Sequence, residues 1–309
     1  MISLIIPTNK TNSEYTSYIV KNIRKIYPDE SQVEIIVSED DTVTMGINYN
    51  NAVTKANGDK IILLHNDMVI KPGFVEQMDK DIVKGRITAY TRVEPPIFPD
   101  EFPGKKVVDC GVDLNSFNYQ KFLDIKIEHD LLDPIGPFGG AQMFFGCMKE
   151  DYLGIDGYTF QLFCEDDDLH LRHKLAGYEQ KISCAHVYHF VSKTSRTGNY
   201  QSIEKESNIN FIKKWGFRQS IYNVVYKKKF ILINSNPQLE EILNPWFNEG
   251  EDIIVEIDGG NFNQQDLQYI QQLNDIIKEN NELGTFELGN LKITINSLKE
   301  HQHDLVTIN

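Results

Sequence analysis

Residues 61–67 of the chain read Ile61-Ile62-Leu63-Leu64-His65-Asn66-Asp67. The four consecutive apolar residues predict a short strand buried on both faces, as strands of parallel sheets usually are. The three polar residues follow this strand without a break, so we expect them at its carboxyl end. Ligands of open parallel sheets bind beyond the carboxyl ends of the strands. The segment therefore predicts both a parallel sheet and a binding edge.

Segments of the same kind surround this strand in the first two hundred residues. Short apolar runs alternate there with segments of helical character, which is the pattern of an α/β fold with a mainly parallel sheet. We expect strands over 4–6 and 33–37, and helices over 13–27 and 47–56. Pro7 is expected to end the first of these strands.

The next part of this region is predicted to be less regular. Irregular structure is expected over residues 92–137, where regular elements would be broken by Pro95, Pro96, Pro99, Pro103 and Pro134. Beyond them we expect an apolar run over 138–147, a helix over 166–176 closed by Gly177, a strand over 182–191 and a polar loop over 192–200. The strand would carry His186 and His189 on opposite faces, so at most one of them faces a cleft.

The character of the sequence changes near Lys227. Apolar runs over 230–233, 253–257 and 291–295 predict strands, and residues 267–277 have apolar residues at helical spacing. We therefore expect a first domain over residues 1–217, a linker over 218–225 and a small, acidic α/β domain over 226–309.

Composition limits the classes of partner. The formal net charge of −14 argues against nucleic acid and anionic membrane surfaces as partners held by bulk charge. A phosphate-bearing small molecule stays possible, because a bound divalent cation reverses the local sign. The sequence contains neither a signal-peptide pattern nor the roughly 20 apolar residues of a membrane span, and its four cysteines lack the close spacing of disulfide or metal motifs. We expect a soluble, cytoplasmic protein.

Four consecutive carboxylates occupy positions 165–168, namely Glu165, Asp166, Asp167 and Asp168. The helix dipole favours acidic residues in the first turn of a helix, which explains one or two of them. A carboxylate that faces a cleft can take a proton from a hydroxyl nucleophile. Asp167 is expected to be a solvated acid at the helix start, and Asp168 is spaced to pair with Arg172 four residues later.

Asp67 is a candidate metal ligand because a carboxylate at a strand end can hold Mg²⁺ or Mn²⁺ while other coordination positions stay open for phosphate oxygens. The alternative is that Asp67 only caps the turn before Lys71-Pro72-Gly73. For His189, a packed strand histidine is the alternative to a ligand.

Several short motifs follow one another along the first domain. They are Leu4–Asn9, Glu34–Asp40, Asn50–Val53, Ala56–Asp67, Phe144–Met148, Gly154–Gly157, the Glu165-Asp166-x-Asp168-Leu169-x-x-Arg172 helix and Val187–His189. Their order and spacing resemble glycosyltransferase family 2, which has the GT-A fold, over about residues 1–217. The family's D-x-D motif reads His65-Asn66-Asp67, so its last acid, the metal ligand in the family, is retained.

The resemblance implies a metal-assisted, inverting transfer of a sugar from a nucleotide-sugar, most commonly UDP-linked in this family, to a hydroxyl of a glycan or related acceptor. It implies Asp166 as general base, with Glu165 orienting it or the acceptor, and Mn²⁺ or Mg²⁺ held by Asp67 and His189. The residues expected to contact the donor are Pro7, Thr8, Asn9, Glu39, Asn50, Asn66 and Asp67. The residues expected to contact the acceptor are Gly140, Asp168 and Arg172.

Two other functions are consistent with parts of the sequence. A sugar-phosphate nucleotidyltransferase also uses acidic metal ligands, but its first strand should lead into a glycine-rich loop, and Pro7–Asn12 contains no glycine. A degenerate GT-A module that binds glycans or acts as a scaffold would explain the missing first acid at His65. The intact Glu165-Asp166 pair argues for an enzyme.

Overall fold

The computed structural model describes residues 1–8, 13–40, 43–134, 144–159 and 164–191, together with Ser207 and four strands near the C-terminus. The chain divides into two compact units, Met1–Tyr200 and Gln201–Asn309. The predicted domain boundary at residue 217 lies outside the described residues and stays a prediction.

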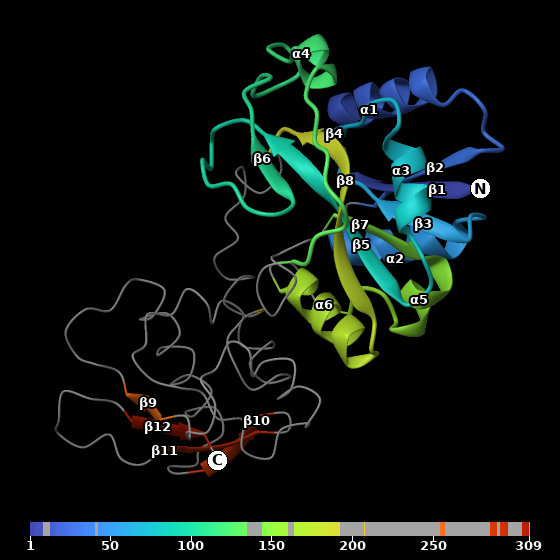
Figure 1. The fold of residues 1–309 in the computed structure, drawn as a ribbon. Coiled ribbons are helices and arrows are strands. Elements are labelled where there is room, and N and C mark those ends of the chain that lie inside the picture. The colour runs from blue at the N-terminus through green and yellow to red at the C-terminus, as the bar shows by residue number, and fades with distance from the viewer. Residues whose placement is uncertain are drawn as a thin grey trace. The chain divides into compact units, whose positions relative to one another are not determined.

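The first unit is built on one mixed sheet with helices on both faces (Figure 1). Its strands are β1 (Ile2–Thr8), β2 (Val33–Glu39), β3 (Lys60–Leu63), β4 (Met68–Val69), β5 (Arg86–Glu94), β6 (Lys105–Val107), β7 (Phe145–Met148) and β8 (Glu179–His189). They lie in the order β2-β1-β3-β7-β5-β8-β4, with β6 beside β5. The pairs β1–β2, β1–β3, β5–β8 and β5–β6 are parallel, while β7 and β4 are antiparallel to their neighbours.

Alternating side chains of the central strands fill two separate cores. Leu4 and Ile62 pack on one face with α1 (Ser13–Ile26), α3 (Phe74–Asp81) and α4 (Tyr119–Leu123). Ile5 and Ile61 pack on the other face with α2 (Met45–Lys55), α5 (Lys149–Gly154) and α6 (Glu165–Leu175). Successive side chains of a strand point to opposite faces, so a central strand with a core on each face needs a continuous apolar run. The predicted α/β fold is confirmed.

Two sequence-based expectations about local structure are wrong. Strand β1 continues through Pro7 to Thr8, since the fixed φ of proline is compatible with extended backbone and only one donor is lost near the strand end. Residues 92–137 are not wholly irregular, because β5 extends to Glu94 and both β6 and α4 lie in this region. The prolines Pro95 and Pro96 follow β5 directly and mark its end.

The second unit contributes four described strands, β9 (Ile254–Glu256), β10 (Thr285–Leu288), β11 (Leu291–Ile295) and β12 (Leu305–Ile308). They form an antiparallel sheet in the order β10-β11-β12-β9. The strands expected over 253–257 and 291–295 are confirmed. The strand expected over 230–233 and the helix expected over 267–277 lie outside the described residues.

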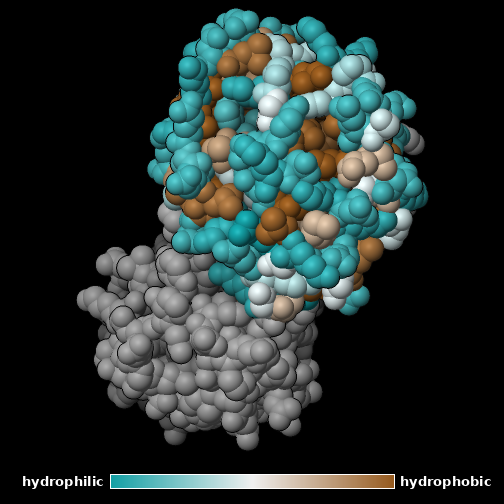
Figure 2. All heavy atoms as spheres, turned by 45° about the vertical axis from the view of Figure 1, so that its right-hand side comes forward, coloured by the Kyte–Doolittle hydropathy of each residue, from teal (hydrophilic) through white to brown (hydrophobic). Residues whose placement is uncertain are grey.

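The visible face of the first unit is mainly hydrophilic, with apolar residues scattered over it (Figure 2). Large exposed apolar side chains come from different elements, such as Val37 on β2, Ile47 on α2 and Leu153 on α5. Among the described residues, no helix combines the length and the apolar character that crossing a bilayer requires.

Candidate functional site

The strands β3, β5 and β8 run in the same direction, so their carboxyl ends lie at one edge of the sheet. Asp67 follows β3, and His189 is the last residue of β8. The short strand β4 joins them: Met68 pairs with His189, and the backbone N–H of Phe190 donates to the carbonyl oxygen of Asp67 at 3.1 Å. The fold thus brings together the two residues that the sequence predicted as metal ligands.

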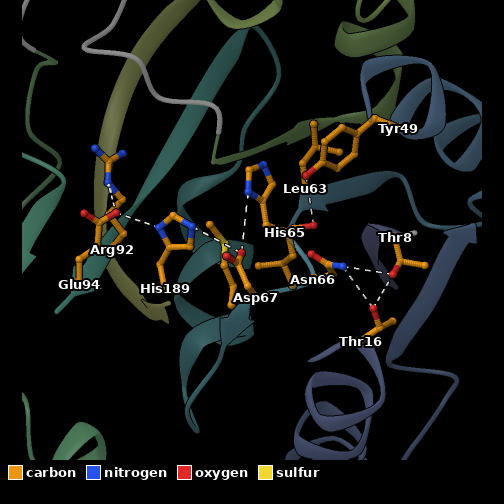
Figure 3. A network of polar contacts seen from close by, with 12 residues as sticks. Thr8, Thr16, Tyr49, Leu63, His65, Asn66, Asp67, Arg92, Glu94 and His189 are labelled. Carbon is orange, nitrogen blue, oxygen red and sulfur yellow. Dashed lines mark hydrogen bonds and ion pairs between the residues drawn. The ribbon is translucent and has the colours of Figure 1, made fainter. Parts of the chain in front are cut away.

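His65, Asp67 and His189 offer three potential ligand atoms that all lie within 4.8 Å of one another (Figure 3). Asp67 Oδ1 lies 3.5 Å from His189 Nε2 and 4.0 Å from His65 Nδ1. Ligand atoms that surround one small divalent cation at about 2.1 Å lie roughly 3–4 Å apart. The set therefore fits a metal ion, and His65 adds a nitrogen to the two residues expected from the sequence.

Glu94, at the end of β5, holds His189 from the side opposite Asp67. Glu94 Oε1 lies 2.8 Å from His189 Nδ1, and the same carboxylate forms ion pairs with Arg92 at 2.8 Å and with Lys105 at 3.5 Å. Phe144 closes the group, with its ring edge-on to both histidines and beneath the Arg92 guanidinium. The pKa of Glu94 is lowered, because the contacts with His189, Arg92 and Lys105 outweigh the effect of burial.

The two histidines differ in charge. Burial lowers the pKa of His65 to about 4, so its imidazole is neutral at pH 7. Burial also acts to lower the pKa of His189, but Asp67 and Glu94 outweigh it and raise that pKa to about 9. In the metal-free protein His189 is therefore a cation at pH 7, and a metal ion that binds there has to displace its proton.

A second polar group lies next to Asp67, at the end of β1. The hydroxyls of Thr8 and Thr16 are 2.5 Å apart, and Asn66 Nδ2 lies 3.2 Å from the Thr8 hydroxyl (Figure 3). Pro7 precedes this group and is buried, whereas Glu39 is exposed at the end of β2. These predicted donor contacts therefore lie at neighbouring strand ends, at the same edge of the sheet.

Asn50, another predicted donor contact, is engaged within the protein. Its side-chain amide donates to the carbonyl oxygen of Tyr158, and its side-chain oxygen accepts from the Tyr158 N–H and the Tyr152 hydroxyl. These three contacts tie α2 to residues 152–158. The proposed donor contact at Asn50 stays a prediction.

The acidic cluster forms the first turn of α6. Asp166 is half-buried, and the Tyr158 hydroxyl donates to its Oδ1 at 3.3 Å. Burial raises the pKa of Asp166 to about 7, although the Tyr158 hydrogen bond and the nearby Arg92 act in the opposite direction. A carboxylate with a pKa near the working pH is suited to general base catalysis. Its neighbour Glu165 is buried.

The other two acids of the cluster have structural surroundings. Asp168 is fully buried and bonds to Arg172 Nε at 2.8 Å and to the Thr159 hydroxyl at 2.9 Å. Arg172 also donates to the carbonyl oxygens of Ile155 and Gly157. The predicted i, i+4 pair is thus confirmed, and the acceptor contacts proposed for both residues stay predictions. The expectation that Asp167 is solvated is wrong: it is buried, and the N-terminal helix dipole favours a carboxylate there.

Stacked rings connect Tyr158, the hydrogen-bond partner of Asp166, to the group of His65, Asp67 and His189. Tyr49 lies between His65, at a centroid distance of 6.4 Å, and Tyr158, at 5.6 Å. Burial, followed by several neighbours that include Asp166 and Asp67, raises the pKa of Tyr49 well above its ordinary value. Tyr49 thus packs against the rings of His65 and Tyr158, and Tyr158 donates to Asp166, so this chain of contacts joins the two groups.

Comparison with known proteins identifies the first unit. Residues 5–144 match the family described as glycosyl transferase family 2. This segment, 140 of the 309 residues, is the part of the chain that is similar to that family. No curated protein matches the chain.

Solved structures with a similar fold include TarS of S. aureus. The structure of TarS 1-349 aligns with a TM-score of 0.50 and 12% identity, over 90% of this chain and 80% of that one. The same TarS fragment in complex with UDP-GlcNAc gives a TM-score of 0.52 and 13% identity over the same shares. A longer TarS structure gives 0.51 and 12%, but only 48% of that chain is covered. At this identity the likeness shows the fold alone, which is GT-A.

Part of the predicted site lies outside the described residues, namely Asn9, Gly140 and the 192–200 loop. Other residues of the site were not predicted as contributors. The His65-x-Asp67 spacing is a local signal that could have indicated a shared ligand set. Glu94, Arg92 and Tyr158 have no such signal, because each reaches the site only through the pairing of distant segments.

Proposed function

We propose that the first unit transfers a sugar from a nucleotide-sugar to an acceptor hydroxyl, with inversion at the anomeric carbon. The observation that carries this proposal is the pairing of two groups around Tyr49: a His-Asp-His ligand set at the strand ends and a carboxylate of raised pKa at the start of α6. A metal-held diphosphate and a general base are the two parts that such a transfer needs.

The donor would lie along the strand ends. Asp67 and His189 would hold Mn²⁺ or Mg²⁺, which when bound supplies positive charge to offset the charge that grows on the leaving diphosphate. Thr8, Asn66 and Glu39 present hydroxyl, amide and carboxylate groups at the neighbouring strand ends of the same sheet edge, and these groups are suited to binding a nucleoside. The UDP-GlcNAc complex of the structurally similar TarS supports a UDP-linked donor.

Asp166 would act as the general base. In its ionised form it accepts the proton of the acceptor hydroxyl at a carboxylate oxygen while the hydroxyl oxygen attacks the anomeric carbon. Tyr158 holds the Asp166 carboxylate through its hydroxyl, and Glu165 beside it would orient the base or the acceptor. General bases typically contribute 10²–10⁴-fold to rate.

A panel of nucleotide-sugars tests this function and separates it from a binding module. The whole chain is incubated with each donor in the presence of Mn²⁺, and release of the nucleoside diphosphate is followed. Turnover of at least one donor, lost in Asp166→Asn, supports a transferase. Tight binding of donors or glycans without turnover of any donor would instead support the degenerate GT-A module. The presence of His65 in place of the first acid of the D-x-D motif favours that alternative.

A further inference from the structure

Arg92 is a buried cation whose side-chain donors are unused. The residue is only 9% exposed, and among the described residues none of the N–H groups of its guanidinium makes a hydrogen bond. Nε forms an ion pair with Glu94 at 2.8 Å, while both terminal nitrogens point away from that carboxylate (Figure 3). Buried donors without acceptors cost free energy. A bound group that accepts from Arg92 would remove this cost.

The charges next to Arg92 leave one positive charge without a partner. Arg92 and Lys105 are both buried, and they share the carboxylate of Glu94, at 2.8 and 3.5 Å. The ammonium of Lys105 also donates to the carbonyl oxygen of Phe98 at 2.7 Å, which carries no full charge. Within this group of three charged side chains, two cations therefore face one anion. Because a buried charge is costly unless it is paired, the group favours a further anion.

Two phenyl rings hold the guanidinium beside the candidate ligand group. Arg92 Cζ lies over the ring of Phe144, 5.4 Å from its centroid, and over that of Phe102, at 5.3 Å. Such contacts attract a cation to the ring face. The ring of Phe144 also contacts His65 and His189 edge-on. Arg92 is thus one side chain away from the strand ends along which the donor is proposed to lie.

We propose that Arg92 binds a phosphate group of the substrate through its terminal N–H groups. A guanidinium is planar and always charged, and it matches phosphate with two parallel, charge-assisted hydrogen bonds. Sugar hydroxyls could accept the same hydrogen bonds but would leave the positive charge unpaired. Two sources can supply the phosphate: the diphosphate of the donor, or a phosphate carried by the acceptor. The inference rests on the proposed function, since it adds a contact to the substrate of the same site.

Binding of UDP and of uridine to the whole chain tests the inference. Calorimetry is performed in EDTA, so that no metal ion contributes to the difference between the two ligands. The wild type should bind UDP more tightly than uridine. Arg92→Gln should lower the UDP affinity at least about tenfold, because it removes charge-assisted hydrogen bonds, and should leave the uridine affinity unchanged. Unchanged uridine binding also shows that the variant is folded.

The same strand offers a matched control. Arg86→Gln makes the same change at the first residue of β5, where Arg86 pairs with Glu179 at 2.6 Å, and it should leave both affinities unchanged. Arg92→Lys is a second variant, which keeps a positive charge near Glu94 and serves if Arg92→Gln does not fold. Since lysine lacks the planar fork of arginine, Arg92→Lys should lower the UDP affinity, but less than Arg92→Gln does.

Inorganic phosphate identifies the source of the phosphate group. If the acceptor supplies it, Arg92→Gln should keep its UDP affinity but bind inorganic phosphate at least about tenfold more weakly when UDP is already bound. A folded Arg92 variant with wild-type affinity for both UDP and inorganic phosphate would overturn the inference.

These titrations contain neither metal nor sugar donor, so their failure leaves nucleotide-sugar turnover as an independent result. A chain in which UDP binding depends on Arg92, but which turns over no donor, would support this inference and contradict the proposed function.

Discussion

His189 Nδ1 lies 2.8 Å from Glu94 Oε1, and this contact couples the end of β8 to the end of β5. In the neutral ring that a metal ion requires, this contact would keep the proton on Nδ1, while the other ring nitrogen, Nε2, lies 3.5 Å from Asp67 Oδ1. Glu94 is therefore a positioning residue for the ligand set.

Replacing this carboxylate should weaken the site without removing a ligand. We expect Glu94→Gln to lower Co²⁺ or Mn²⁺ affinity about 10–100-fold, because the amide keeps the shape but no longer raises the basicity of His189. Equilibrium dialysis measures the change, and thermal unfolding checks the fold. Glu101→Gln, which removes an exposed carboxylate paired with Lys106, is the control. Unchanged metal affinity in Glu94→Gln would show that Glu94 does not support His189.

Turnover should depend on pH through Asp166. Its pKa is raised to about 7, so the ionised form that accepts a proton dominates only above that pH. The rate should rise with pH, reach half its plateau near pH 7 and fall about tenfold per unit below it. A pH–rate profile of donor turnover at saturating metal measures this.

The Tyr158 hydroxyl sharpens the same test. It donates to Asp166 and lowers the pKa of that carboxyl, so Tyr158→Phe should move the midpoint of the profile to higher pH. Tyr152→Phe is a control in a neighbouring tyrosine that bonds to Asn50 instead. A midpoint that stays in place in Tyr158→Phe, or lies well below 7 in the wild type, would contradict the assignment of the titrating group to Asp166.

The pair Asp168–Arg172 should matter for stability. Arg172→Met removes the partner of a fully buried carboxylate and releases the carbonyl oxygens of Ile155 and Gly157. We expect a loss of about 3–5 kcal/mol in the free energy of unfolding, as for other broken buried pairs. Denaturant unfolding measures it, and the double variant Asp168→Asn/Arg172→Met should recover part of the loss. A loss below about 1 kcal/mol would mean that the Asp168–Arg172 pair does not stabilise the attachment of residues 155–157 to α6.

Asp67 should link metal binding to nucleotide binding. Asp67→Ala should remove the metal dependence of UDP binding, because it deletes the one carboxylate of the ligand set. Calorimetry measures the UDP affinity of the wild type and of Asp67→Ala, each in the presence of Mn²⁺ and in the presence of EDTA. If EDTA leaves the UDP affinity of the wild type unchanged, the metal has no part in holding the donor.

The sequence predicted the parts of the fold that follow from local pattern. The apolar runs at 4–6 and 61–64 indicated central strands, and Gly177, with a φ of 78°, ends α6 as expected. Strand β5 and its pairing with β8 were not predicted, although they bring Glu94 to His189. The pairing joins segments almost a hundred residues apart, and no local periodicity encodes it.

The candidate site also contains residues that local motifs predict and residues that only the tertiary structure brings in. Asp67 and Asp166 follow from short motifs at a strand end and a helix start. The internal contacts of Asn50 and Asp168 could not be predicted, because they depend on how residues 152–159 pack against α2 and α6.

The most direct test of the central claim compares the wild type with Asp166→Asn in donor turnover and in UDP affinity. The account predicts that a UDP-sugar is turned over by the wild type, and that Asp166→Asn lowers this turnover at least about 10²-fold while UDP affinity stays nearly the same. An Asp166→Asn enzyme with wild-type turnover would contradict it.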